Sequence, residues 1–354
     1  MKTLARSLAL GAIGAAAIGI AAEAASLRQV ATIPVPGLDS YDIGYVDHGK
    51  YYLADRTNKA VDIFDTKTNK LLRQITGFVG PGPSGDGPKG GPNGVVVIGN
   101  EVWAGDGDST VKVADLKKGQ ITDTIATGGK RRADEVAYDS KDKVFIIAND
   151  AEEPSPFLTL ISTRRGHKIL GKVMMPRATD GLEQPVYYKG VFYVAVPELD
   201  KDEHKGGIAV IDPKKAQLTK IIEVANCRPQ GLELGRGSNM ILGCNAGSKG
   251  SKIPPMAAVF DAKAEKLIPV TDKFGGADMA TYDRKLGLYL VGGREAPGGP
   301  SVGVIDAKTN KWLENIPVPP NPHSIAADNG TGHVFVPSAA TGGKCGGCIV
   351  VLGR

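Results

Sequence analysis

One phrase recurs seven times along this chain: an apolar strand, an Asp, a turn rich in Lys, Thr and Asn, and a second apolar strand. The clear copies are VDIFDTKTNKLLRQI from Val61, VKVADLKKGQITDTI from Val111, IAVIDPKKAQLTKII from Ile208 and VGVIDAKTNKWLENI from Val302; weaker ones begin at Leu158 and Ala258. Successive copies are about 45–50 residues apart, a period typical of propeller blades. The 47 Gly and 23 Pro residues also suit many short strands joined by turns.

The seventh copy is split between the two ends of the chain. CIVVLGR ends at Arg354, and the matching second strand, SLRQVATIPVP, begins at Ser26. We expect the last blade to take three strands from 324–327, 333–336 and 349–352, and its fourth from 30–35. Joining the termini in one blade removes an open sheet edge. The sequence therefore predicts an all-β fold, a seven-bladed β-propeller of four-stranded antiparallel blades, formed by residues 25–354 as one domain.

The conspicuous Asp of the phrase is predicted to be structural. Its carboxylate can accept backbone N–H bonds in an Asx-turn and so start the tight hairpin. It stands at Asp65, Asp115, Asp212, Asp261 and Asp306, and the other two copies have Ser162 and Gly353 in its place.

Residues 1–24 are predicted to be a secretory signal peptide. Lys2 and Arg6 precede an apolar run from 8 to 22, and Ala22-Glu23-Ala24 is a small-x-small cleavage site. The run is short and rich in Ala and Gly for a transmembrane helix, so a retained N-terminal anchor is the alternative. No later stretch approaches a membrane span. We expect a periplasmic or secreted protein, cut near Ala24.

The four Cys residues fall into two local pairs, Cys227 with Cys244 and Cys345 with Cys348, and an exported protein favours disulfides for both. No His follows Cys348, so its CxxC is not a haem attachment site. A formal net charge of +5 and 6% aromatic residues do not indicate nucleic-acid binding. We expect a monomer.

Polar residues at the blade boundaries form two columns that we expect on one face of the ring. The first column precedes each first strand and lines one mouth of the central channel: Asp42, Asn93, Glu135, Gln184, Gln230, Met279 and His323. The second follows each second strand: Asp55 and Arg56, Asp106 and Asp108, Asn149 and Asp150, Glu198, Asn245, Arg294 and Glu295, and Ser338. Polar groups from several blades can converge there on one ligand.

Two interpretations of the columns remain open. In the first, oxygen ligands surround a hard cation, Ca²⁺, that polarises a carbonyl or activates water; the ligands would be Asp42, Asn93, Asp106, Glu135 and Asn149. That arrangement would make a hydrolase, lactonase or lyase, with Glu135 or Asp42 as its base. In the second, the same residues line a wet channel and satisfy one another's hydrogen bonds.

Five long loops are predicted on the same face: Gly77–Pro92, Pro197–Gly207, Asn245–Pro255, Gly292–Pro300 and Ala339–Gly347. Long loops gathered on one face suggest a recognition surface. The sequence therefore favours a binding or scaffold protein without catalysis, which recognises a small molecule or a protein partner at the channel mouth.

Two segments resemble a known repeat. NPHSIAADNGTGHVFVPSAA from Asn321 and YYLADRTNKAVDIFDTKTNK from Tyr51 look like the two halves of the unit found in bacterial YVTN-type seven-bladed propellers, and GPNGVVV and RPQGLEL are further copies of its opening. The resemblance covers essentially the whole mature chain. It implies an exported propeller of a family in which several members bind partners or ligands without catalysis. GPNG at 91–94 also resembles the segment with the metal-ligand Asn of sugar-lactonase propellers.

Overall fold

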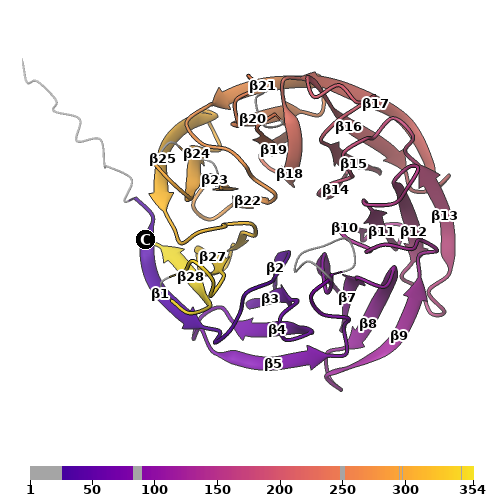
Figure 1. Ribbon diagram of the computed structural model, residues 1–354, viewed down its shortest axis with the longest axis horizontal. Coiled ribbons are helices and arrows are strands. Elements are labelled where there is room, and N and C mark those ends of the chain that lie inside the picture. The colour runs from indigo at the N-terminus through magenta and orange to yellow at the C-terminus, as the bar shows by residue number, and fades with distance from the viewer. Residues whose placement is uncertain (1–25, 83–89, 248–251, 295, 297, 344) are drawn as a thin grey trace, which may run out of the picture.

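The computed structural model describes residues 26–82, 90–247, 252–294, 296, 298–343 and 345–354. Over these residues it has 28 strands in seven four-stranded antiparallel sheets, and no helix. Figure 1 shows the sheets as blades around a central opening, with the first strand of each blade innermost. The predicted seven-bladed propeller is confirmed.

Six blades take their strands in chain order from the centre outward. Blades 1 to 3 are β2 (Gly44–Asp47), β3 (Lys50–Asp55), β4 (Ala60–Asp65), β5 (Leu71–Thr76); β6 (Val95–Ile98), β7 (Glu101–Asp106), β8 (Thr110–Asp115), β9 (Gln120–Ala126); and β10 (Val136–Asp139), β11 (Val144–Asn149), β12 (Phe157–Ser162), β13 (Ile169–Met174). Blades 4 to 6 are β14 (Pro185–Tyr188), β15 (Val191–Val196), β16 (Lys205–Asp212), β17 (Gln217–Ala225); β18 (Arg228–Leu234), β19 (Asn239–Asn245), β20 (Met256–Asp261), β21 (Lys266–Thr271); and β22 (Ala280–Asp283), β23 (Leu288–Gly293), β24 (Ser301–Asp306), β25 (Lys311–Pro317).

Blade 7 closes the ring with both ends of the chain. Its strands are β26 (Ala326–Asp328), β27 (His333–Ser338), β28 (Cys348–Gly353) and, on the outer edge, β1 (Arg28–Pro34). In the antiparallel β1–β28 pair, Ile33 lies opposite Ile349 and Arg28 opposite Gly353. Closure by the N-terminal strand is confirmed. The strand begins two residues before the expected position because Arg28 and Gln29 also pair with the end of β28.

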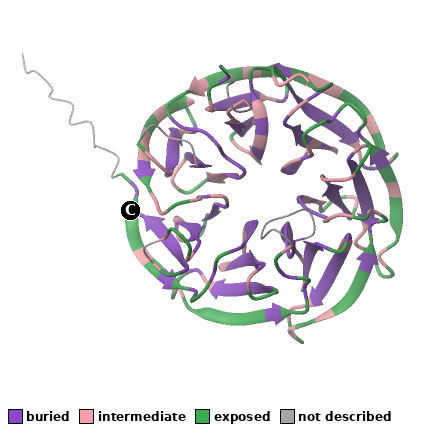
Figure 2. Cartoon of the chain, viewed as in Figure 1, coloured by how far each residue is buried: buried purple, intermediate pink, exposed green. Residues whose placement is uncertain are grey.

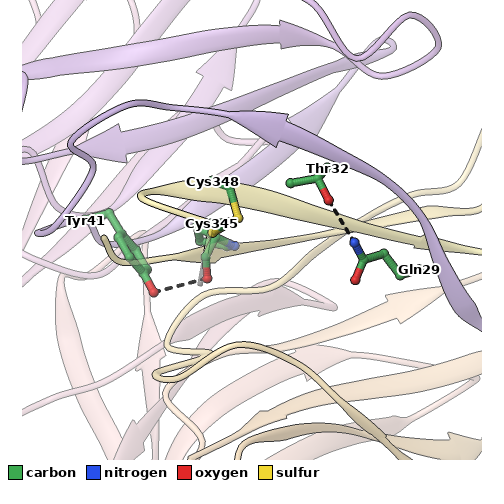
Figure 3. Close-up of a disulfide and its surroundings, with 6 residues drawn as sticks. Gln29, Thr32, Tyr41, Cys345 and Cys348 are labelled. Carbon is green, nitrogen blue, oxygen red and sulfur yellow. Dashed lines mark hydrogen bonds between the residues drawn. A yellow bond between two sulfur atoms is a disulfide. The ribbon is translucent and has the colours of Figure 1, made fainter. Parts of the chain in front are cut away.

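Both predicted disulfides are present. Cys227 immediately precedes β18 and is bonded to Cys244 in the neighbouring strand β19, with 5.1 Å between the two Cα atoms. Cys345 is bonded to Cys348 at the start of β28, beside the N-terminal segment of the chain (Figure 3). There the Val35 N–H donates to the Gly347 carbonyl at 3.0 Å. The second disulfide therefore lies at the closure of the ring.

The Asp of the repeated phrase starts the outer hairpin of its blade, as predicted. Asp65 Oδ1 accepts the N–H groups of Lys67 at 3.0 Å and Thr68 at 2.7 Å. Asn69 then takes a φ of 57°, in the left-handed region that Asn tolerates better than most residues. The same Asx-turn recurs at Asp115, Asp212, Asp261 and Asp306.

The core lies between neighbouring sheets. Between blades 1 and 2, for example, Tyr52 and Val61 pack in one buried cluster with Val95 and Val102. Figure 2 shows the inner strands largely buried and the outermost strands largely exposed. Burial on both faces explains why the inner strands are nearly continuous apolar runs, and it makes the ring a rigid frame for its channel.

One loop is shorter than predicted. The expected insertion Pro197–Gly207 ends at His204, because β16 begins at Lys205, which pairs with Ala225. Residues 1–25, which include the predicted signal peptide, and residues 83–89 of the loop Gly77–Pro92 lie outside the described residues. No helix among the residues described is long and apolar enough to cross a membrane.

Candidate binding site at the channel mouth

The loop-rich end of the channel is lined by one residue from each blade, near the beginning of the inner strand. Backbone pairing fixes this level in four blades: the N–H groups of Asp42, Asn93, Asp134 and Glu183 donate to the second-strand carbonyls of Ala54, Gly105, Ala148 and Ala195 at 2.8–2.9 Å. In the other three blades, the register between the first and second strands places three more residues at the same level: Gln230, Asp278 and His323. We call these seven residues the mouth layer.

The mouth layer corrects the first column at three positions. Three residues of that column lie one residue beyond the mouth layer along the chain: Glu135, Gln184 and Met279. They are at the level of Ile43, because the Ile43 carbonyl accepts from the Ala54 N–H just as the Glu135 carbonyl accepts from the Ala148 N–H. A slip of one residue changes which side of a strand a side chain occupies. Sequence reasoning therefore missed Asp134, Glu183 and Asp278 as mouth residues. An acidic residue directly before each of those three column positions was the available signal.

An alternating row of charges crosses the mouth. Arg56, with 1% of its surface exposed, forms an ion pair with Asp42 and donates to Asn93 Oδ1 at 2.7 and 2.9 Å. Asp42 also contacts His323 Nε2 at 2.6 Å, and the other ring nitrogen, Nδ1, contacts Asp278. Asp278 in turn accepts from Arg294 at 2.7 Å. Blades 1, 2, 6 and 7 are thereby connected at the mouth.

This row fixes the protonation of its central groups. Burial alone would lower the pKa of His323, but Asp278 and Asp42 raise it to about 10. Burial also opposes ionisation of Asp42, yet Arg56 and His323 hold the pKa of that carboxyl well below its usual range. His323 is therefore an imidazolium between two carboxylates at neutral pH.

A second cationic centre lies in blade 3. Arg132 contacts Asp134 at 2.8 Å and Asp150 at 2.7 Å. Burial would lower the pKa of the Arg132 guanidinium, but Asp134 and Asp150 raise it well above its usual value. The ion pairs described so far join the cationic side chains of Arg56, Arg132, Arg294 and His323 to the carboxyls of Asp42, Asp134, Asp150 and Asp278.

Glu183 is the mouth carboxyl without an ion-pair partner among the described residues. Its Oε1 accepts one long hydrogen bond, from Gln230 Nε2 at 3.3 Å. Burial, and then the charges of Asp278 and Asp134, raise its pKa well above the usual range. Glu183 therefore offers a carboxyl group that can both donate and accept hydrogen bonds.

A pocket of about 500 Å³ opens beside Glu183, over blades 3 to 5. Its lining is mostly polar or charged and includes Arg131, Arg132, Asp150, Glu152, Thr179, Asp180, Glu183, Lys201 and Gln230. At its rim, Arg228 contacts Glu198 at 2.8 Å and also pairs with Asp180. We call this hollow the mouth pocket.

The remaining predicted site residues have internal partners. Asp55 caps its own turn, accepting from Asn58 N–H at 2.8 Å, and Asp106 pairs with Lys112. Asn149 Nδ2 donates to Ser109 Oγ at 2.9 Å. Gln184 Oε1 accepts a hydrogen bond from the Leu232 N–H at 2.8 Å. The Asn245 side chain is hydrogen-bonded to Gln230, and Glu198 forms an ion pair with Arg228. Glu295 lies outside the described residues.

The proposed calcium ligands do not form a compact group. Asp42 and Asn93 share Arg56, Asp106 faces Lys112, and Asn149 faces Ser109. Over the part of the chain that the structure describes, no three or more His, Cys, Asp or Glu side chains are arranged to hold a metal ion. Arg56 and Lys112 already occupy oxygen atoms of Asp42, Asn93 and Asp106 that a calcium ion would need.

The fold is similar to that of Kuenenia stuttgartiensis hydrazine synthase. The TM-score is 0.73, with 11% sequence identity over 92% of this chain and 97% of that one. This likeness establishes the propeller architecture alone. The chain matches no protein-family model and no curated protein.

Proposed function

We propose that this protein is an exported binding protein that holds a small polar ligand in the mouth pocket. The observation that carries this proposal is the pocket of about 500 Å³ on the loop-rich face, lined by charged groups from blades 3 to 5. Convergent polar groups in a concavity of this size are typical of small-molecule sites.

The electrostatics of the mouth favour binding over catalysis. A general base needs a pKa near the working pH. His323, with a pKa of about 10, is already protonated at neutral pH, and Asp42 is held ionised by two cations. Such fixed charges orient a polar ligand without being reorganised themselves.

The mixed lining indicates the character of the ligand. Arg131 and Lys201 offer positive charge, while Glu152 and Glu183 offer carboxyl groups on the same pocket. A ligand with several hydrogen-bonding groups fits this lining better than an apolar one. Export is supported by the predicted signal peptide, by the two disulfides and by the resemblance to YVTN-type propellers.

The test uses a bulky side chain that fills the pocket. Thr179 is exposed and lines the mouth pocket; Thr219 is also exposed and lies on β17, the outer strand of blade 4. Thr179 Oγ1 donates to Glu198 and accepts from the Lys201 N–H, and Thr219 Oγ1 donates to the Val210 carbonyl. The test variant is Thr179→Trp, and Thr219→Trp controls for placing the same bulky side chain at an exposed threonine away from the pocket. Glucose, glutamate, glycine betaine and citrate are titrated against each protein while thermal unfolding is followed.

We expect at least one probe to raise the unfolding temperature of the unaltered protein saturably, because a ligand that binds only the folded state stabilises it. Thr179→Trp should abolish that response and Thr219→Trp should keep it. The proposal fails if no probe gives saturable stabilisation, or if Thr179→Trp responds like the unaltered protein.

A further inference from the structure

A second cavity, of about 340 Å³, occupies the channel itself. Its lining runs along the inner strands from Glu135 and Met279 to Arg284 and Asn329, both exposed in turns that follow inner strands. Those turns lie on the face opposite the long loops, because successive turns of an antiparallel blade alternate between the two faces. This channel cavity is therefore distinct from the mouth pocket.

Glu135 lies at the end of the channel cavity nearest the mouth. Only 4% of its surface is exposed, and no other described residue makes a hydrogen bond or ion pair with its side chain. Of its neighbours at the same level, Ile43 and Met279 are apolar, and the side-chain oxygen of Gln184 accepts instead from the Leu232 N–H at 2.8 Å. Burial, and then the charges of Asp134 and Glu183, raise the pKa of Glu135 well above its usual range.

Glu233 is a second carboxyl on the same cavity. Glu233 in blade 5 occupies the position that Ala137 occupies in blade 3. Glu233 pairs with Ile241, the third residue of β19, and Ala137 pairs with Ile146, the third residue of β11. Ala137 is two residues beyond Glu135, so Glu233 lies two strand residues deeper, about 7 Å along the channel at 3.3 Å per residue. A period of two also means that both side chains use the channel-facing side of their strands.

The surroundings of Glu233 are polar but contain no ion pair to it among the described residues. Burial raises its pKa to about 7, against the opposing effects of the Leu234 N–H and the Arg284 charge. Burial, and then the charges of Asp47 and Glu233, raise the pKa of the phenol of Tyr45, from blade 1, to about 12. Tyr138 and Tyr282 also line the cavity. Aromatic rings of this kind favour a cation as well as an alkyl chain.

We propose that the channel cavity binds a short linear diamine, with one ammonium group at Glu135 and the other at Glu233. A buried carboxylate costs free energy unless a cation or hydrogen-bond donors accompany it. Two ammonium groups supply both charges, and the methylene chain fits the tyrosine and aliphatic lining between them. A divalent metal ion fits less well, since no suitable group of three or more ligating side chains is present among the described residues.

Diamine binding should release protons from the two carboxyls, and this release can be measured. Without ligand, burial raises the pKa of both carboxyls, that of Glu233 to about 7, so each keeps its proton to a higher pH than a glutamate in water. Binding of a diammonium ion stabilises the two carboxylates, so protons leave the carboxyls and enter the buffer. Calorimetric titrations in two buffers of different ionisation enthalpy report the number of protons released.

The experiment titrates 1,4-diaminobutane and 1,5-diaminopentane into the full mature protein, with 1,4-butanediol as the uncharged control. The variants are Glu135→Gln and Glu233→Gln, with Glu223→Gln, a surface glutamate that contacts Arg177, as the matched control. We expect saturable diamine binding with proton release, and no binding of the diol. Loss of one charge-assisted contact should weaken the affinity about 10- to 100-fold in each channel variant, and Glu223→Gln should change nothing.

The proposal is overturned if neither diamine binds, if the diol binds equally well, or if Glu135→Gln keeps the full affinity and proton release. Thr179→Trp separates this site from the mouth pocket, because it should leave diamine binding intact. If diamine binding is instead lost in Thr179→Trp and kept in Glu135→Gln, the channel proposal is wrong while the mouth pocket gains support. Unfolding curves of both Gln variants establish that they fold.

Discussion

Replacing His323 by Gln should destabilise the protein in a pH-dependent manner. In the folded state the imidazolium lies between Asp42 and Asp278, and 20% of its side chain is exposed. Glutamine cannot carry the charge, so both carboxylates lose a cationic partner in a buried setting. Breaking a buried ion pair by removing one partner costs about 3–5 kcal/mol.

The pKa of His323 gives an independent magnitude. It rises from 6.5 to about 10 on folding, and each pKa unit corresponds to about 1.4 kcal/mol. At pH 7 the charged ring then contributes about 4 kcal/mol at most, and solvent screening of its exposed part reduces this to about 3 kcal/mol. The two routes agree, and for a chain of this size we expect the unfolding temperature to fall by at least about 5 °C.

The sign of the pH effect follows from the raised pKa. The contribution of His323 is complete below pH 6.5, where the unfolded state also binds the proton, and it is lost as the pH rises through about 10. Thermal unfolding from pH 6 to 10 should therefore show a gap between the unaltered protein and His323→Gln that closes with rising pH. His204→Gln, at an exposed histidine bonded to Asn226, is the control. A gap that is absent at pH 7, or that stays constant to pH 10, would refute the reasoning.

Three further perturbations test other parts of the structure. Deleting residues 26–36 removes β1, with its buried Ile33, and the buried Leu27 that precedes it, so unfolding should become less cooperative and occur at a much lower temperature. An unchanged unfolding temperature would mean that β1 does not close the ring. Asp306→Ala removes the acceptor of two turn N–H bonds, whereas Asp306→Asn keeps an acceptor oxygen, so only the Ala variant should unfold measurably earlier, and equal curves would contradict the Asx-turn. Glu135→Gln should be more stable than the unaltered protein at pH 8 and close to it at pH 4.5, because the raised pKa of Glu135 makes folding less favourable as the pH rises above the unfolded value; no change with pH would show that this carboxyl is not buried unpaired.

The sequence predicted the ring because its repeated residues perform local mechanics. The Asp of the phrase caps the same turn in five blades, and the split seventh copy pairs as β1 with β28. These features depend on residues close in sequence or on a repeated pattern, so a single chain displays them.

The mouth was predicted less well, because its alignment depends on strand register. Asp42, Asn93, Gln230 and His323 were placed at the correct level, whereas Glu135 was taken in place of Asp134. No local pattern marks a one-residue slip at the short segment before a strand. The pairing of Asp42 with Arg56 and His323 was also invisible, since it joins residues 14 and 281 positions apart.

We propose that the propeller encloses ligand sites along its axis, in the mouth pocket and in the channel cavity. A crystal structure of the protein with 1,4-diaminobutane tests the channel site most directly. We expect continuous electron density in the channel cavity, with one nitrogen within hydrogen-bonding distance of a Glu135 oxygen and the other of a Glu233 oxygen. A cavity holding only water at a saturating diamine concentration, or diamine bound solely on the outer strands, would contradict it.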